Sequence, residues 1–548
     1  MTAHAIIFHR SILMLIRLAM TAVVLAVPDA FSAERAETKR IEVPDAGLET
    51  WNPKEQKWGA EWKLSKTGRC WTEGAHGGAC CALIHSTADT ERCCLTSPGL
   101  SRIKGGMELR VAFFARWLKG DNRVWVTLED LCAYPMDWYP LGQTFLPKDG
   151  QWHRLQVDIK VPPVPEDVTL RVSIGLPQPT QRSHWTKPIA VPSDTEYLLD
   201  DISVEILKAG KTAAPKRPVT PSFVLGDARD NPSLYGVFWT PWRTYCGVPI
   251  STPHDYDKTH DEIRQELDLM QRIGVKWVRS IWRWDKMEWS KGQFEHALLD
   301  FVVAEAWKRD IRIVPALATT PRWTSTAPPD EPAFRIYPPR LADWETFVHH
   351  IVNHFKQQIK YWEVWNEPNV FSRWHGTVED YFHLQRATFR SARRADPSSK
   401  ILLGAFAQSG HAYLDQLLRL GAKDYFDILS CHPYPGKGGT DKIEYMVDRL
   451  RLVLADHGCE DRPIWFTEVG WKDEDAGSAA ERNRWVNNLY GRSFGGAVEK
   501  RFWFVFDTWS RQPVQGGFAL VNYREGKWEL TPAYHAYGQI TGKAVEPK

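Results

Sequence analysis

The chain has 548 residues, of which 43% are hydrophobic and 25% are charged, as in an ordinary globular protein. A chain of this length typically folds as about two to four domains. Its formal net charge is only +2, so electrostatics provide no reason to expect a nucleic acid as partner.

The first 32 residues have the features of a secretory signal peptide. Arg10 and Arg17 precede a short apolar run over 18–27, and small residues before Ala33 suit a signal peptidase. Ten apolar residues are too few to span a bilayer, although an uncleaved membrane anchor is the alternative. We therefore expect a secreted or periplasmic protein with no stable membrane insertion after signal cleavage.

The chain has nine cysteines. If the chain is exported, they are candidates for disulfides, because an oxidising compartment favours these bonds. The sequence does not choose among the 15 pairings that the six in the first third allow. Their vicinal spacing also lacks the two-residue gap of zinc knuckles. These six are Cys70, Cys80, Cys81, Cys93, Cys94 and Cys132; the other three are Cys246, Cys431 and Cys459.

Residues 40–208 have the composition of an all-β domain. Short runs rich in β-branched and aromatic residues alternate with clusters of Gly, Pro and Asp, which predicts a β-sandwich or jelly roll. The clearest predicted strands are 108–115, 124–128, 152–159, 168–174 and 197–204. A stretch rich in Lys, Ala and Pro follows, and we interpret 209–222 as a linker.

From 223 to 548 the pattern changes to apolar strands that alternate with amphipathic helices. Trp344, Phe347, Val348, Ile351 and Phe355 show the helical period before the fourth strand. A second such helix, with apolar residues at 443, 446, 450, 453 and 454, precedes the seventh strand. The eight predicted strands are 235–239, 277–281, 311–317, 361–365, 401–406, 426–431, 464–467 and 502–506. Strict alternation of eight units predicts a (β/α)8 barrel.

Two carboxylates stand at the carboxyl ends of predicted strands, where the active site of such a barrel lies. Glu367 belongs to a Trp-Asn-Glu-Pro corner after the fourth strand, and Glu468 ends the seventh. Cleavage of a glycosidic bond needs two such carboxyl groups on opposite sides of the bond. The alternative for either residue alone is a solvated or salt-bridged strand end.

Other strand ends supply candidate substrate-binding groups. Arg279 on the second strand can hydrogen-bond Glu468 and hold it as a carboxylate. Asn366 can bind a sugar hydroxyl, and His432 and Tyr434 after the sixth strand can orient the carboxylates or bind sugar. Trp509, after the eighth strand, can stack under a sugar ring. For each of these residues a purely structural role is the alternative.

No metal or cofactor site is predicted for the barrel. His350 and His354 have the i, i+4 spacing of a zinc helix, but the Glu that would follow the first His is missing. The helix would also lie outside the barrel. The chain has neither a phosphate-binding glycine loop nor a Gly-x-Ser-x-Gly elbow, so we expect no cofactor.

Residues 362–369 resemble the clan of retaining (β/α)8 glycoside hydrolases, most of all family 39, with families 5 and 30 as further candidates. The clan carries Asn-Glu on strand 4, which matches Asn366 and Glu367, and a Glu on strand 7, which matches Glu468. Its strand-2 Arg matches Arg279, and its strand-6 His-x-Tyr matches 432–434. The resemblance covers about 225–540 and implies that Glu367 is the acid/base and Glu468 the nucleophile.

The first domain resembles jelly-roll carbohydrate-binding modules around 151–155 and 199–202. Such modules often carry a structural calcium ion, which the resemblance implies here as well. An excess of tryptophan, 27 residues, also fits a protein that binds sugars, although most of these rings are expected in the core.

Together these features predict a secreted retaining glycosidase that acts on a polysaccharide or oligosaccharide by double displacement. Glu367 is expected to keep its proton in an apolar wall near negative charge, whereas Glu468 is expected to stay ionised. The alternatives are a transglycosylase on the same scaffold, an inactive carbohydrate-binding protein, and a structural or adhesive surface protein.

Overall fold

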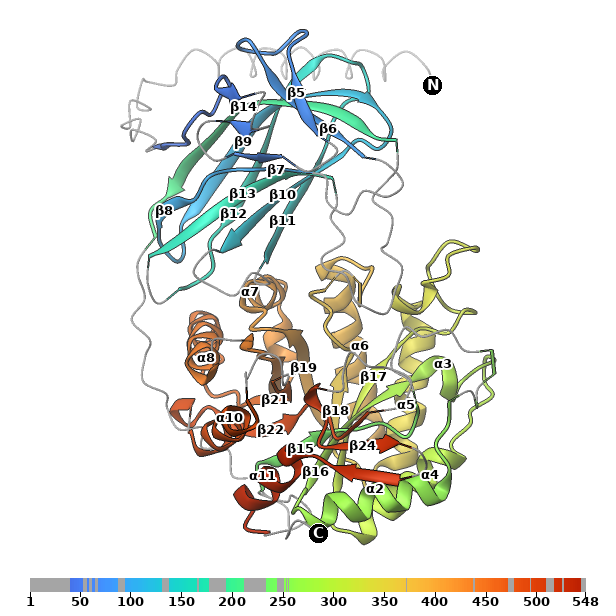
Figure 1. Cartoon of the computed structure of the whole chain (residues 1–548). Helices are drawn as coiled ribbons and strands as arrows, with labels where there is room; N and C mark the ends of the chain where they lie inside the picture. Colours follow the sequence, from blue (N-terminus) through green and yellow to red (C-terminus); the bar gives the residue numbers. More distant parts are fainter. Residues whose placement is uncertain are drawn as a thin grey trace, which may run out of the picture.

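The computed structural model shows a β-rich domain followed by a barrel (Figure 1). It describes residues 40–52, 57–58, 62–64, 68–86, 94–130, 138–164, 167–176, 194–210, 233–243, 251–252, 254, 256–370, 372–436, 439–471, 478–492, 494–508, 517–524 and 527–543. The predicted signal peptide, Trp509 and almost all of the predicted linker lie outside these residues.

The β-rich domain is built from two six-stranded antiparallel sheets, which confirms the predicted sandwich class. The first sheet has the order β12 (Trp152–Lys160), β9 (Glu108–Lys119), β14 (Glu196–Lys208), β6 (Cys81–His85) and β5 (Arg69–Trp71), with β1 (Arg40–Ile41) beside β14. The second has the order β11 (Trp138–Phe145), β10 (Arg123–Asp130), β13 (Val168–Gly175), β7 (Cys94–Thr96) and β4 (Lys63–Leu64), with β8 (Leu100–Ile103) beside β13. A separate two-stranded sheet pairs β2 (Trp51–Asn52) with β3 (Lys57–Trp58).

Alternating apolar side chains of the two sheets meet in one core. On β9, Leu109, Val111, Phe113 and Ala115 point inward, as the two-residue period of a strand requires. The thiols of Cys70, Cys80 and Cys81, three of the cysteines expected to form disulfides, are free. Burial, reinforced by the neighbouring Cys80, raises the pKa of Cys70 to about 12. Cys93, Cys132 and Cys246 lie outside the described residues.

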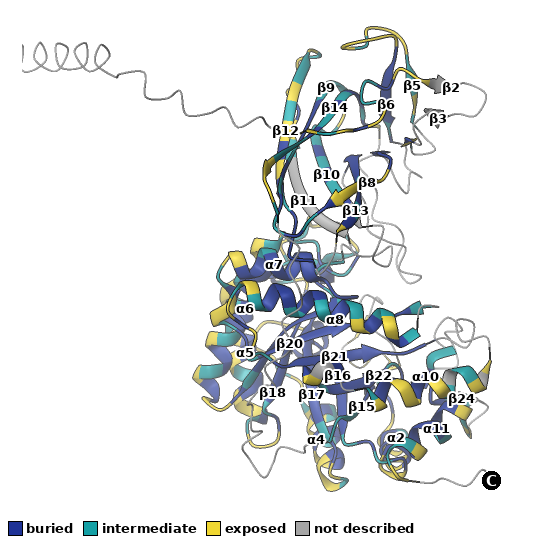
Figure 2. Ribbon diagram, turned by 90° about the vertical axis from the view of Figure 1, so that its left-hand side faces the viewer, coloured by how far each residue is buried: buried dark blue, intermediate teal, exposed yellow. Residues whose placement is uncertain are grey.

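The second half of the chain forms a closed barrel of eight parallel strands, as predicted. Figure 2 shows these strands buried beneath a ring of helices whose outer faces are exposed. In chain order they are β15 (Tyr235–Phe238), β16 (Trp277–Arg283), β17 (Arg312–Ala318), β18 (Tyr361–Val364), β19 (Lys400–Ala407), β20 (Ile428–His432), β21 (Ile464–Val469) and β22 (Val498–Trp503).

Large apolar side chains fill the amino-terminal half of the barrel interior. Trp277, Tyr361 and Trp465 are the largest of this layer, which Val314, Leu402, Ile428 and Phe502 complete. One period of two residues further along, β16 and β18 place Arg279 and Glu363 on the same inner side. The barrel is therefore closed below by aromatic packing, and its polar groups lie toward the carboxyl ends of the strands.

The eighth strand starts earlier than predicted, at Val498 rather than at 502. Sequence periodicity missed this start because the strand opens with charged residues. Lys500 is nevertheless buried: its Nζ donates to the carbonyl of Ser233 and lies over the Trp277 ring, 4.4 Å from the ring centre. Arg501 is buried as well, and its guanidinium donates to the backbone carbonyl of Arg492.

The helices around the barrel follow their predicted periods. The apolar residues predicted for the helices before strands 4 and 7 are all buried, on α5 (Leu341–Phe355) and α8 (Gly439–Asp456). Thr259 and Thr377 begin their helices with capping boxes, which satisfies the first free amides. The other helices are α2 (His260–Arg272), α3 (Trp284–Met287), α4 (Ala297–Lys308), α6 (Val378–Ala395), α7 (His411–Arg419), α10 (Ala479–Gly491) and α11 (Pro532–Ile540).

The β-rich domain rests on the barrel through α7, the helix that follows β19 (Figure 1). Strand β11 lies against α7, and Ala412 of this helix belongs to the apolar core of the β-rich domain. The two halves of the described chain therefore share packed apolar surface. None of the helices in the described residues is long and apolar enough to cross a membrane.

Candidate active site

Two residues of the segment that follows β18 have a left-handed backbone conformation. Trp365 has a φ of 67° and Glu367 a φ of 52°, a conformation that costs non-glycine residues about 1–3 kcal/mol each. Hydrogen bonds hold the turn: the Trp365 amide donates to the carbonyl of Leu317, and the Glu367 amide to that of Ala405. The corner is thus fixed by the strands on both sides, and it presents Glu367 at the mouth of the barrel.

Asn369 fixes the same corner through the backbone at the end of β19. Its side-chain amide donates to the carbonyl of Ala407 (3.0 Å) and its side-chain oxygen accepts from the Ala407 amide (2.9 Å). The indole of Trp365 donates to the carbonyl of Arg373 at 2.9 Å. The segment after β18 is therefore tied to the end of β19, and the position of Glu367 is set by backbone rather than by a flexible loop.

Glu468 lies near the end of β21 and is almost fully buried. Its Oε1 accepts from Nη1 of Arg279 at 2.5 Å, and its Oε2 accepts from the hydroxyl of Tyr434 at 2.7 Å. Both carboxylate oxygens are thus held by donors, which orients the group. Burial, together with the negative charge of Glu468, raises the pKa of Tyr434 well above its ordinary value, so its hydroxyl stays a donor.

Arg279 joins three acceptors at the centre of the barrel without any exposure to solvent. Besides Glu468, its Nε donates to Oε2 of Glu363 at 2.6 Å and its Nη2 to the side-chain oxygen of Asn366 at 2.8 Å. Burial lowers the pKa of Arg279, but the charges of Glu363 and Glu468 raise it further than burial lowers it. The guanidinium is therefore charged and links strands β16, β18 and β21.

His432, at the end of β20, lies between the two candidate catalytic carboxylates. Its Nδ1 is 3.0 Å from Oε1 of Glu367 and 3.6 Å from Oε2 of Glu468. One oxygen of each carboxylate and one ring nitrogen of His432 all lie within 4.8 Å of one another. A carboxylate can only accept, so Nδ1 carries the hydrogen that points to Glu367.

The environment of Glu367 differs from the sequence-based expectation of an apolar wall and negative charge. Burial raises the pKa of this carboxyl. The hydrogen bond and charge of His432, together with the charges of two arginines, outweigh burial and lower the pKa to about 2. The arginines are Arg373, whose Nε lies 3.4 Å from Oε2, and Arg279. Glu367 is therefore ionised in this structure.

The structure brings together six of the seven predicted site residues and adds two that the sequence reading missed. The six are Glu367, Glu468, Arg279, Asn366, His432 and Tyr434. Trp509 lies outside the described residues. The two additions are Glu363 and Arg373. Glu363 stands two residues after Tyr361, so strand period alone directs it inward, whereas the position of Arg373 in a loop carries no sequence signal.

Two groups of side chains in the described residues have the spacing to hold a metal ion. One is the site itself, where Arg279, Tyr434 and His432 already donate to the carboxylates. The other consists of Asp415, Asp456 and His457, in which Arg419 and His457 bind the Asp415 carboxylate. Neither group lies in the described part of the β-rich domain, so the structure does not support the calcium ion that the module resemblance implied.

The histidines at 350 and 354 meet other groups on the outside of the barrel. Nε2 of His350 lies 2.7 Å from Nε2 of His296, and Nε2 of His354 lies 2.6 Å from the carboxylate of Asp300. They lie apart from the carboxylates at the barrel mouth.

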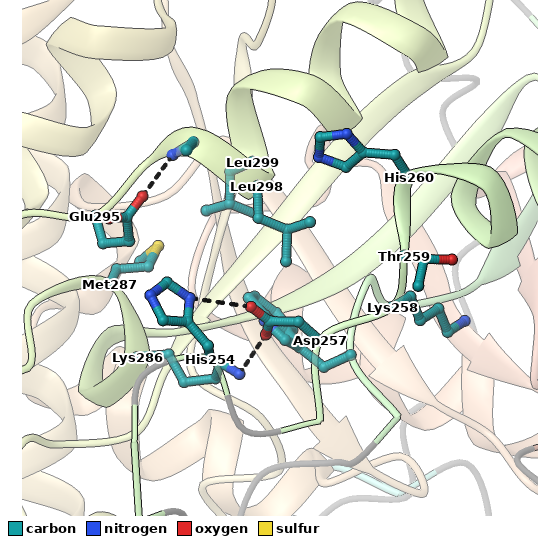
Figure 3. Close-up of a pocket in the computed structure, with 12 residues that line it drawn as sticks. His254, Asp257, Lys258, Thr259, His260, Lys286, Met287, Glu295, Leu298 and Leu299 are labelled. Atoms are coloured by element: carbon teal, nitrogen blue, oxygen red, sulfur yellow. Dashed lines mark hydrogen bonds and ion pairs between the residues drawn. The ribbon is translucent and has the colours of Figure 1, made fainter.

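A cavity of about 270 Å³ lies between the loops that follow β15 and β16 (Figure 3). Figure 3 shows His254 and Lys286 both directed at Asp257; Nζ of Lys286 is 2.6 Å from the Asp257 carboxylate. None of the predicted site residues lines this cavity. We place the candidate active site at the carboxylates, because within the described residues ionisable groups converge there from four strands of the barrel.

Two family models match consecutive stretches of the barrel. Residues 253–335 match the β-galactosidase model of glycosyl hydrolase family 42, and residues 339–537 match the glycosyl hydrolase catalytic core. Both stretches of the barrel therefore match models of glycosyl hydrolases. This agrees with the resemblance seen in the sequence.

The barrel is also similar to two curated proteins. A β-xylosidase from Caldicellulosiruptor saccharolyticus is 31% identical over 250 residues, which cover 38% of this chain and 49% of the relative. A β-xylosidase from Geobacillus stearothermophilus is 28% identical over 120 residues, 20% of this chain and 24% of the relative. The chain thus spans about half or less of the length of these relatives.

Two solved structures of glycoside hydrolases are among those that align with this chain. A family 39 glycoside hydrolase from Bacteroides cellulosilyticus WH2 gives a TM-score of 0.46 at 16% identity over 78% of this chain and 79% of that one. A monomeric β-xylosidase from Caulobacter crescentus CB15 gives a TM-score of 0.46 at 20% identity over 59% of this chain and 69% of that one.

Proposed function

We propose that this chain is a retaining glycosidase that cleaves O-glycosidic bonds in a polysaccharide or oligosaccharide by double displacement. The observation that carries this proposal is the close approach of Glu367 and Glu468, whose nearest oxygens lie within 4.8 Å. A retaining enzyme needs its carboxyl groups about 5–5.5 Å apart, whereas an inverting enzyme needs about 6.5–9.5 Å to admit a water.

In the first step Glu468 attacks the anomeric carbon and forms a glycosyl-enzyme ester, while Glu367 protonates the departing oxygen. In the second step Glu367 removes a proton from water, which hydrolyses the ester. The donors on Glu468 support its role as nucleophile, because Arg279 and Tyr434 hold both of its oxygens in place. Asn366, held by Arg279, is positioned to bind a sugar hydroxyl near the bond that breaks.

The decisive experiment is chemical rescue on aryl glycosides, with β-xylosides first because the curated relatives are β-xylosidases. Glu468→Gly should lose turnover, and azide should restore it and yield a glycosyl azide of inverted configuration. Glu367→Gly with azide should yield the azide of retained configuration. Full activity in either variant would reject the residue assignment, and an inverted hydrolysis product from the wild type would reject double displacement.

The same assay separates the alternative functions. An inactive carbohydrate-binding protein predicts no turnover of any glycoside, together with retained binding of an oligosaccharide. A transglycosylase predicts longer products when a sugar acceptor is added at high concentration. If the chain is a structural surface protein, incubation of a polysaccharide with it should deplete none of the polysaccharide.

We further propose that residues 40–208 bind glycan and that residues 1–32 direct export. Trp152 supports the first proposal: its ring lies on the sheet face opposite the main core, and its indole donates to the carbonyl of Gly74. Trp152→Ala should weaken retention of a full-length Glu468→Ala protein on insoluble polysaccharide. Amino-terminal sequencing of the protein from its native host should begin at Ala33.

A further inference from the structure

Arg373 lies beside Glu367, the candidate acid, and is not among the residues predicted from the sequence. It follows the Trp-Asn-Glu-Pro corner in the loop between β18 and α6. Its amide donates to the carbonyl of Val370 at 2.8 Å, so its backbone is fixed close to Glu367. Its guanidinium reaches Oε2 of Glu367 at 3.4 Å, and 22% of its side chain is exposed.

The two oxygens of Glu367 have different partners. Oε1 faces Nδ1 of His432, and Oε2 faces Arg373. A guanidinium has only donors, so it cannot accept a hydrogen from a protonated Oε2. Both oxygens therefore face donors, and this arrangement fits the ionised carboxyl whose pKa is lowered to about 2.

A general acid must carry a proton at the moment the leaving group departs. The two donors stabilise the ionised form of Glu367, so the withdrawal of either one would raise its pKa and favour the protonated acid. His432 is fully buried at the end of β20, and its Nδ1 also lies 3.6 Å from Glu468. Arg373 is the partly exposed donor, it lies in a loop, and its contact with Glu367 is the longer one.

The remaining charged groups near Glu367 do not move easily either. Arg279 is fully buried and is held by Glu363, Glu468 and Asn366. Tyr434 donates to Glu468 rather than to Glu367. Glu468 is itself held by two donors. Of the groups that set the charge of Glu367, Arg373 is thus the one that an incoming substrate can displace.

We propose that Arg373 is a positioning residue that holds Glu367 ionised in the free enzyme and leaves its Oε2 when the leaving-group part of the substrate enters. This inference rests on the proposed glycosidase function. It makes protonation of the acid a consequence of substrate binding, and it places the leaving-group side of the substrate over Arg373.

The pH dependence of the two kinetic constants tests this coupling. The alkaline limb of kcat/KM reports the free enzyme and that of kcat reports the substrate complex. In the wild type the limb of kcat/KM should lie at lower pH than the limb of kcat. Arg373→Gln should move the kcat/KM limb upward by about one pH unit, a roughly tenfold gain in kcat/KM on that limb. Arg373→Lys should keep most of the separation.

Two controls isolate the effect. Arg322→Gln removes an exposed guanidinium from the loop after β17, where it donates to the carbonyl of Pro328, and it should leave both limbs in place. A dinitrophenyl glycoside needs little protonation of its leaving group, so the kcat/KM limbs of all these enzymes should converge on it. Thermal melting verifies that each variant is folded.

The possible outcomes are distinct. If the kcat/KM limb of Arg373→Gln stays where the wild type has it, or if Arg322→Gln moves it equally, the coupling is rejected while the glycosidase stands. If the wild type hydrolyses no glycoside, or if Glu367→Gln keeps the alkaline limb, the proposed function itself fails.

Discussion

Nη1 of Arg279 and Oε1 of Glu468 lie 2.5 Å apart, joining strands β16 and β21 through the centre of the barrel. Neither side chain has more than 8% of its surface exposed. A charge pair this deeply buried is stable only when its other hydrogen-bonding atoms are satisfied too. Glu363 and Asn366 supply those partners, so the candidate nucleophile depends on a network that reaches across three strands.

Replacement of Arg279 should therefore affect both stability and catalysis. Arg279→Ala leaves Glu363 and Glu468 buried without their cation, which typically costs about 3–5 kcal/mol of unfolding free energy. Arg279→Lys keeps the charge but cannot reach three acceptors at once, and kcat should fall by at least about 100-fold, equivalent to about 2.7 kcal/mol. Urea denaturation and aryl glycoside kinetics measure the two effects.

The matched control is Arg110→Ala in the β-rich domain. Arg110 forms a two-bond pair with Asp158 at the surface, and surface pairs contribute little to stability. Equal losses in the two alanine variants would contradict the central role of Arg279.

Glu363 should matter for stability more than its place in an apolar strand suggests. It is fully buried, and its Oε1 has no hydrogen-bond partner within the described structure, so it holds Arg279 through Oε2 alone. Glu363→Gln keeps an acceptor and should cost about 1.5–3 kcal/mol, the contribution of a hydrogen bond to a charged group. Glu363→Ala should cost more, about 3–5 kcal/mol. A Glu363→Ala protein as stable as the wild type in urea would refute this role.

Tyr434→Phe should reduce activity and should also lower stability, because it leaves an oxygen of buried Glu468 without its donor. The change removes the donor that lies 2.7 Å from Oε2 of Glu468 but keeps the ring contacts with Phe504 and Phe518. A hydrogen bond to a charged group contributes about 1.5–3 kcal/mol, so kcat/KM should fall by roughly 10- to 100-fold. Tyr425→Phe, which removes a hydroxyl bound by Arg390 on the outer helices, serves as control and should leave kcat/KM unchanged.

Acid should destabilise the protein in part through Asp285. Burial raises the pKa of Asp285, but Arg283 and Arg335, which lie 2.6 and 2.7 Å from its carboxylate, lower it from 3.8 to about 2. The folded state thus binds this proton less readily than the unfolded chain. The resulting stability, about 2 kcal/mol, is present above pH 4 and is lost as the pH falls through about 2.

Comparison with Asp285→Asn isolates this contribution. The difference in unfolding free energy between wild type and variant should be constant from pH 7 to pH 5 and should shrink between pH 4 and pH 2. A difference that stays constant down to pH 2 would show that Asp285 does not carry it.

The sequence predicts the barrel well because its strands and helices differ in period. The strand start at Val498 was missed, since Lys500 and Arg501 look like surface residues until the rings and carbonyls that cover them are known. Such burial depends on partners far away in the chain, which a local pattern cannot contain.

The candidate site was predicted where a residue type and a strand end coincide, as at Glu367 and Glu468. Glu363 was missed because its partner Arg279 lies 84 residues away on another strand. Arg373 was missed because a loop has no period that would direct its side chain. The low pKa of Glu367 likewise follows from His432 and Arg373, which only the folded chain brings to it.

Through Ala412, the stability of the barrel and that of the β-rich domain depend on each other. Ala412 lies in α7 directly after β19, the strand whose Ala407 holds Asn369 and so the corner of Glu367. Removal of the β-rich domain would uncover this apolar contact beside the very strand that supports the acid. Calorimetry of the intact chain should accordingly give overlapping rather than separate transitions, and the barrel is best engineered together with the domain that precedes it.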